Sequence, residues 1–167
     1  MIQLDHVSLN FKDQYILKDF TEHIRPKELV GISGKSGCGK SSLLRALLGF
    51  VPLTEGRIRI DGLPLEPSTV MEIRKKIAYL PQDLNFPVDT VRDMVHLPFE
   101  LHANRQLHFS EKELFRLWEQ LNLDRRLYDR KVHRISGGQR QRILLSVMAM
   151  LHKPLCLVDE PASALDS

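Results

Sequence analysis

The sequence is poor in cysteine, has no long hydrophobic run and carries no strong excess of charge. Its 167 residues contain two cysteines, Cys38 and Cys156, which are too few for a disulfide framework and favour a reduced, cytoplasmic setting. The longest apolar stretch, at 143–151, falls short of the ~20 residues that span a bilayer, so any membrane connection is expected to run through a partner. Residues 1–10 lack an apolar core segment, and we expect no signal peptide. The formal net charge of +3 does not by itself favour nucleic acid.

The hydrophobic patterns that are present predict an α/β protein. Alternating or short apolar runs predict strands at 2–11, 16–24, 29–32, 57–60, 77–80 and 155–158, with 29–32 and 155–158 buried. Helical spacing with capping and stop signals predicts helices at 43–48, from 111 onward and from 137 to about 152. The stretch at 83–134 is more polar and mostly helical in pattern. This order favours one domain over 1–167, with a core at 1–82 and 153–167 and an inserted helical subdomain at 83–152.

A glycine-rich loop separates the expected strand at 29–32 from the helix that follows. Residues 34–41 read Gly-Lys-Ser-Gly-Cys-Gly-Lys-Ser and fit the pattern G-x-x-x-x-G-K-[ST]. Glycines bring backbone N–H groups close to phosphate oxygens, Lys40 supplies a positive charge for the β- and γ-phosphates, and Ser41 offers a hydroxyl to Mg²⁺. The alternative is a plain turn between strand and helix. We predict that ATP is bound by Gly34, Ser36, Gly37, Cys38, Gly39, Lys40, Ser41 and Ser42.

A second helix start with bare backbone groups lies at 135–139, Ile-Ser-Gly-Gly-Gln. Its serine can cap the helix, and its two glycines leave N–H groups open beside the positive end of the helix dipole. The motif predicts a second anion site at Ser136, Gly137, Gly138 and Gln139. Taken alone, it is equally compatible with a helix start that binds nothing.

Two carboxylates follow the apolar strand at 155–158. Asp159 is suited to hold Mg²⁺ and Glu160 to orient a water molecule. The alternative is a core strand with solvated charges at its end. Gln82, just past the strand at 77–80, offers an amide at the matching edge of the sheet.

In order and spacing, these motifs resemble the ATP-binding cassette (ABC) family over essentially the whole chain. The matches are 34–41 to its Walker A loop, Gln82 to its Q-loop, 135–139 to its LSGGQ signature with Ile135 in place of Leu, 155–160 to Walker B and 163–166 to the D-loop. The resemblance implies a P-loop NTPase core of the ABC ATPase type, with an N-terminal antiparallel β subdomain and an inserted α-helical subdomain. It also puts Tyr15 in the place of the aromatic residue that stacks on adenine, with Phe11 as the alternative.

The same resemblance implies an ATPase whose two subunits close head to tail around two ATP molecules. Glu160 would then be the general base, Lys40 would stabilise the transferring phosphoryl group, and Gln82 would sense Mg²⁺ and water. Ser41, Gln82 and Asp159 would form the metal site. Each ATP would lie between the phosphate loop of one subunit and the signature of the other.

The partners that the resemblance implies are a second nucleotide-binding subunit and a membrane permease subunit, at the cytoplasmic face of the cell membrane. Four apolar residues are candidates for gripping the permease, although each could equally pack inside the helical subdomain: Leu84, Phe86, Val88 and Val91. The alternative function is a soluble ABC ATPase acting on nucleic acid or ribosomes, but the paired cassettes, coiled coils and zinc modules usual in such relatives are absent from the sequence. We therefore expect no nucleic-acid partner, and the signature argues against a P-loop kinase or GTPase.

Two further expectations come from comparing this sequence with the family pattern. The family has another strand and a switch histidine beyond the position of Ser167, so a C-terminally truncated chain with weak hydrolysis is expected. The segment at 89–101 looks somewhat like the ATPase subunits of small bacterial exporters, including one linked to iron.

Overall fold

The computed structural model describes residues 1–11, 14–35, 37–84 and 86–160, and its chain divides into two compact units. The first unit spans residues 1–76 and the second spans residues 77–167. The predicted division into a core at 1–82 and 153–167 and a helical subdomain at 83–152 stays a prediction.

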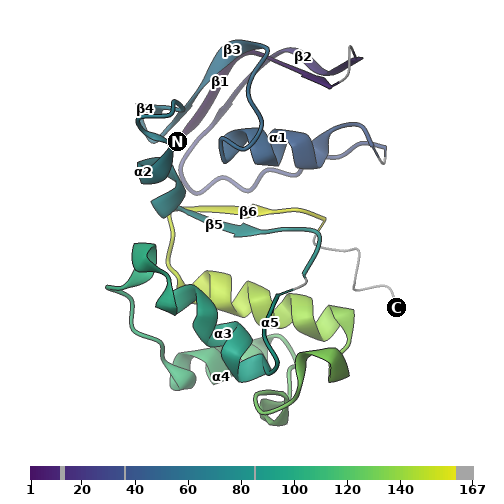
Figure 1. The fold of residues 1–167 in the computed structure, drawn as a ribbon, viewed down its shortest axis with the longest axis vertical. Coiled ribbons are helices and arrows are strands. Elements are labelled where there is room, and N and C mark those ends of the chain that lie inside the picture. Colours follow the sequence, from purple (N-terminus) through teal and green to yellow (C-terminus); the bar gives the residue numbers. More distant parts are fainter. Residues whose placement is uncertain (12–13, 36, 85, 161–167) are drawn as a thin grey trace. The chain divides into compact units, whose positions relative to one another are not determined.

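The first unit is built on an antiparallel sheet in the order β2-β1-β3-β4 (Figure 1). Its strands are β1 (Ile2–Phe11), β2 (Gln14–Ile24), β3 (Glu55–Ile60) and β4 (Leu63–Pro64). Ile2 lies opposite Ile24 on one side and Ile60 on the other, so that apolar residues line up on one face of three strands. This confirms the antiparallel β subdomain, although residues 12–13, between β1 and β2, lie outside the described residues.

The hairpin between β3 and β4 follows directly from its turn sequence. Asp61 and Gly62 both have positive φ values, of 55° and 82°. A two-residue turn of this kind suits the right-handed twist of the strands that it joins. Asp-Gly is among the residue pairs that favour such a turn, so the local sequence accounts for this hairpin.

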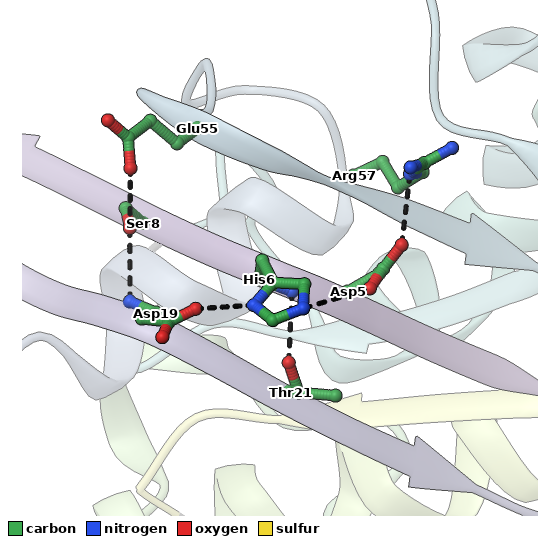
Figure 2. A network of polar contacts seen from close by, with 7 residues as sticks. All are labelled: Asp5, His6, Ser8, Asp19, Thr21, Glu55 and Arg57. Carbon is green, nitrogen blue, oxygen red and sulfur yellow. Dashed lines mark hydrogen bonds and ion pairs between the residues drawn. The ribbon is translucent and has the colours of Figure 1, made fainter.

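Bulges interrupt the sheet where β1 passes between its two neighbours, and polar side chains cross the strands there (Figure 2). His6 has a φ of 51° and Asp19 a φ of 50°, and the two side chains meet at 2.6 Å between Nδ1 and Oδ1. The backbone N–H of His6 donates to Thr21 Oγ1 at 3.0 Å, and that of Asp19 donates to Ser8 Oγ at 3.0 Å. These contacts fix the register on both sides of the bulge.

The segment at 29–32 corrects the sequence analysis, which predicted a buried strand. It belongs to no strand in the described part of the chain, and Leu29, Val30 and Ile32 are all exposed. Part of the segment borders a cavity of about 450 Å³, whose lining also includes residues of β2 and α1. The physical reason is that an apolar run becomes a strand only where its backbone joins a ladder, and in the first unit this segment pairs with none.

Two helices complete the first unit. α1 (Lys40–Leu47) begins at the glycine-rich loop and buries Leu43, Leu44, Ala46 and Leu47. α2 (Val70–Lys75) has no counterpart in the sequence analysis. Arg74 ties the two together, because its Nε donates to the carbonyl oxygen of Leu48 at 2.8 Å.

The second unit is mainly helical and contains the larger core. Its helices are α3 (Val91–Glu100), α4 (Glu111–Gln120) and α5 (Gly137–Met150), with 3₁₀ turns η1 (His102–Asn104), η2 (Arg125–Leu127) and η3 (Val132–Arg134). Ser110 Oγ accepts from Glu113 N at 3.3 Å, so the predicted start of α4 is confirmed. The fully buried Trp118 of α4 donates through Nε1 to Ser146 Oγ of α5 at 3.1 Å, which joins the two helices.

A two-stranded parallel sheet lies in the same unit as these helices. β5 (Ile77–Leu80) pairs in register with β6 (Leu155–Val158). The parallel pairing confirms the prediction, but burial is less complete than predicted: Leu157 is buried and Cys156 is exposed. The exposure is confined to Cys156 itself, because its partner Ala78 and the next residue on that face of β5, Leu80, are buried in the helical core.

Candidate functional site

The predicted phosphate loop occupies the first unit and runs directly into α1. Gly37 has a φ of 80°, and Gly39, the N-cap of α1, has a φ of 99°. Such backbone conformations are readily adopted only by glycine. The loop thus ends at a helix start whose first-turn N–H groups have no acceptor within the helix, which is the local structure that binds phosphate.

Lys40 folds back over this loop. Its Nζ donates to the carbonyl oxygens of Gly34 at 3.0 Å and Lys35 at 3.2 Å. The ammonium group therefore lies at the loop, where a phosphate bound by the loop would meet it. Backbone donors, helix dipole and ammonium converge here, so the residues present fit the triphosphate of ATP.

Two glycines of the loop, Gly34 and Gly39, are also closely packed. A Cβ on Gly34 would lie 2.6 Å from Cys38 Sγ, and one on Gly39 would overlap Ile16 Cγ2. Of the other predicted loop residues, Ser41 and Ser42 lie in the first turn of α1, and Ser36 lies outside the described residues.

The predicted adenine-stacking residue is accessible. Tyr15 lies on β2 with 47% of its surface exposed, and the Lys18 ammonium is 5.3 Å from its ring centroid. The side chain of Phe11, the alternative, lies outside the described residues. An exposed aromatic ring can stack on a base, so the assignment to Tyr15 stays a prediction.

The carboxylate end of the predicted Walker B strand is in the second unit, where β5 and β6 end side by side. The N–H of Asp159 donates to Leu80 O at 2.9 Å, which extends the pairing by one residue, and Asp159 is 3% exposed. Just beyond, Gln82 Nε2 donates to Glu160 Oε2 at 2.6 Å. The parallel pairing thus brings together Gln82 and Glu160, two of the predicted catalytic residues.

Glu160 is held in an unusual conformation. Its φ is 49°, in the left-handed region that non-glycine residues seldom adopt. A residue that sequence reasoning missed contacts it: Gln141 Nε2, from α5, lies 3.4 Å from the carbonyl oxygen of Glu160. The sequence offered only a weak signal for Gln141, a polar residue at a helical position that the apolar pattern assigns to the core.

The predicted signature forms a complete capping box at the start of α5. Ser136 Oγ accepts from Gln139 N at 3.1 Å, and Gln139 Oε1 accepts from Ser136 N at 3.0 Å. The cap provides an acceptor for the N–H of Gln139, the third residue of the helix. Helix geometry leaves the N–H groups of Gly137 and Gly138 without an intrahelical acceptor. The motif is therefore both a helix start and a potential anion site.

The four candidate permease contacts divide by burial. Val91 is completely buried, so it belongs to the core of the second unit and lines no open groove. Leu84, Phe86 and Val88 are partly buried and pack against that core. For Val91, the alternative is therefore correct: the residue packs inside the helical region.

No helix in the described ranges is long and apolar enough to cross a membrane.

Comparison with known proteins gives one consistent result. The ABC transporter family pattern matches residues 17–163. The chain is 34% identical to the manganese transport system ATP-binding protein MntB of Listeria innocua, covering 99% of this chain and 69% of that protein. It is 33% identical to the ergothioneine transport ATP-binding protein EgtV of Helicobacter pylori, covering 100% of this chain and 78% of that protein. Among solved structures, the dimeric ATP-binding cassette MJ0796 in a post-hydrolysis state with ADP and Pi matches with a TM-score of 0.82 and 30% identity, covering 100% of this chain and 77% of that chain.

Proposed function

This chain belongs to the ABC transporter family as an ATP-binding and ATP-hydrolysing subunit, and we propose that Lys40, Ser41, Gln82, Asp159 and Glu160 carry its catalytic cycle. The observation that supports this most directly is the 2.6 Å hydrogen bond between Gln82 and Glu160. It joins the ends of two parallel strands at the position where the family motifs predict the attacking water.

Each of these residues has a proposed role in the cycle. Lys40 and the backbone N–H groups of the loop bind the phosphates of ATP, and Lys40 stabilises charge on the transferring phosphoryl group. Ser41, Gln82 and Asp159 would hold Mg²⁺, which supplies charge neutralisation when bound. Glu160 accepts a proton from the attacking water, a role that typically contributes about 10²–10⁴-fold in rate. Gln82 orients the Glu160 carboxylate for that transfer.

We further propose that two copies of the subunit close head to tail on ATP. The capped start of α5 at Ser136 supports this, because its open N–H groups can contact an anion held by a second copy. The dimeric state of the MJ0796 cassette is in line with it. ATP binding would then favour the closed dimer, and hydrolysis would release it.

The closed and open states would act on a membrane permease subunit from the cytoplasmic face of the membrane. The two curated relatives named above have similar identity to this chain, yet their names give manganese and ergothioneine as cargo. We therefore assign the choice of cargo to the permease rather than to this subunit.

The experiment that tests this function separates binding from turnover. Glu160→Gln should bind ATP as the wild type does, lose hydrolysis, and accumulate as an ATP-dependent dimer on size exclusion. Lys40→Ala should lose ATP affinity. A Glu160→Gln protein that hydrolyses ATP at the wild-type rate would remove Glu160 from the proposed role.

A further inference from the structure

The signature helix α5 carries a buried amide that the proposed catalytic cycle does not use. Gln141 is 3% exposed, and its Nε2 lies 3.4 Å from the carbonyl oxygen of Glu160. Its Oε1 has no hydrogen-bond partner among the described residues. Gln141 is one helical turn beyond Gly137, the first residue of the helix.

Burying a glutamine side chain at this position costs free energy unless its amide group forms hydrogen bonds. Buried polar side-chain atoms nearly always have a partner, and an orphaned carbonyl oxygen is therefore an exception to explain. The other buried residues further along α5 are mainly apolar, including Ile143, Leu144 and Val147. An apolar side chain would fit the same row, so packing alone does not explain an amide at Gln141.

The contact between the Gln141 amide and Glu160 suggests an explanation. Glu160 is held from three directions: the preceding residue, Asp159, donates its N–H to Leu80 of β5, the carboxylate accepts from Gln82, and the main-chain carbonyl meets Gln141 of α5. A non-glycine residue with φ of 49° persists only where its surroundings hold it. The contact from Gln141 restrains the backbone of Glu160 from the side of the signature helix.

We propose that Gln141 is a positioning residue that ties the signature helix to Glu160, and so couples anion binding at Ser136–Gln139 to the placement of the general base in the same chain. This rests on the proposed function, in which Glu160 is the base and the start of α5 contacts ATP held by a second copy. When anion binding shifts or orders the first turn of α5, the change is transmitted to Glu160 through Gln141, which lies a single helical turn further along. Each of the two nucleotide sites in the dimer would thereby affect the other.

The test uses Gln141→Met, which keeps length and volume while removing the donor and the orphaned acceptor. The expected result is a fall in kcat of about tenfold to a hundredfold, the scale of a slightly misplaced catalytic group, with ATP Kd, KM and Tm at wild-type values. Gln141→Asn, which keeps the amide but shortens its reach, should lower kcat in the same way. The matched control is Ser146→Ala, which removes another buried hydrogen bond of α5, one made to Trp118 of α4, and should lower Tm while leaving kcat unchanged.

A readout that does not depend on turnover is hydrogen–deuterium exchange of the peptide spanning 155–160 in the nucleotide-free protein. Exchange there should be faster in Gln141→Met than in the wild type or in Ser146→Ala. Wild-type kcat and wild-type exchange in both Gln141 variants would overturn the proposal, and so would a loss of Tm matching that of Ser146→Ala. If Glu160→Gln abolishes turnover while Gln141→Met does not change it, only this inference fails. If Glu160→Gln leaves turnover intact, the proposed function fails first.

Discussion

The side chain of Gln82 donates a hydrogen bond of 2.6 Å to Glu160, a residue 78 positions further along the chain. The two residues meet because β5 and β6 run parallel and each ends just before one of them. The same pairing hydrogen-bonds Asp159 to Leu80 and buries its side chain. The carboxylate that we assign to proton transfer is therefore oriented by a neutral amide.

Replacing Lys40 with alanine should weaken ATP binding by about tenfold to a hundredfold, since a hydrogen bond to a charged group contributes about 1.5–3 kcal/mol. The reason is the position of the Lys40 ammonium over the carbonyls of Gly34 and Lys35 at the phosphate loop. Titration with a fluorescent ATP analogue measures the effect. The matched control is Lys35→Ala, which removes an equal charge from the same loop and should bind nearly as the wild type does. Equal losses of ATP affinity in both variants would show that Lys40 contributes only its charge and not its position.

Replacing Gly39 with alanine should destabilise the protein and impair ATP binding. The residue has a φ of 99°, and a Cβ there would overlap Ile16 Cγ2. Backbone strain of this kind costs on the order of 1–3 kcal/mol, and each kcal/mol lowers Tm by about 2–4 °C in a protein of this size.

The control for Gly39 is Gly31→Ala, because an added Cβ at Gly31 meets no atom within 4 Å. Calorimetry of the two variants should show a lower Tm for Gly39→Ala alone. An unchanged Tm and unchanged ATP affinity in Gly39→Ala would contradict the close packing of the loop against β2.

A pH dependence is expected at the bulge of β1 (Figure 2). The hydrogen bond that the His6 ring donates to Asp19 raises the pKa of His6 above its ordinary value of 6.5, and the charges of Asp19 and Asp5 act in the same direction. Because the folded pKa is the higher one, the stabilisation is fully present below pH 6.5 and is lost as the pH rises through the raised pKa. Arg57, paired with Asp5, opposes the shift.

The variant that tests this is His6→Asn, since asparagine tolerates positive φ but does not titrate. Its Tm should fall below that of the wild type at about pH 5.5, and the gap should shrink by about pH 9. His23→Asn is the control, because the ring of His23 makes no hydrogen bond within the described ranges, and it should show no such change. A gap for His6→Asn that stays the same at both values would show that the ion pair plays no part. The effect is small, because the His6 side chain is 74% exposed and solvent screens the pair.

The sequence predicted the turns and helix starts that are determined by neighbouring residues. The Asp61-Gly62 turn, the Ser110 cap and the Ser136–Gln139 start of α5 were all readable, because each depends on residues within four positions of one another. The fold class followed from the order of strands and helices, and family resemblance added the motif assignments.

What the sequence could not supply depends on distant contacts. Residues 29–32 have the composition of a buried strand, but a strand also needs a paired neighbour, which composition does not report. Cys156 is apolar in pattern yet exposed, while its strand partner Ala78 is buried, so position in the strand alone does not report burial. The contact from Gln141 to Glu160 joins a helix to a loop across 19 positions, so no local signal could reveal it.

The most direct test of the central claim is the rate of phosphate release from saturating Mg-ATP by Glu160→Gln, measured beside its ATP affinity. We predict that the affinity stays within about twofold of the wild type while the rate falls by about 10²-fold or more, the scale of a lost general base. Phosphate release at the wild-type rate from a variant that binds ATP normally would contradict it.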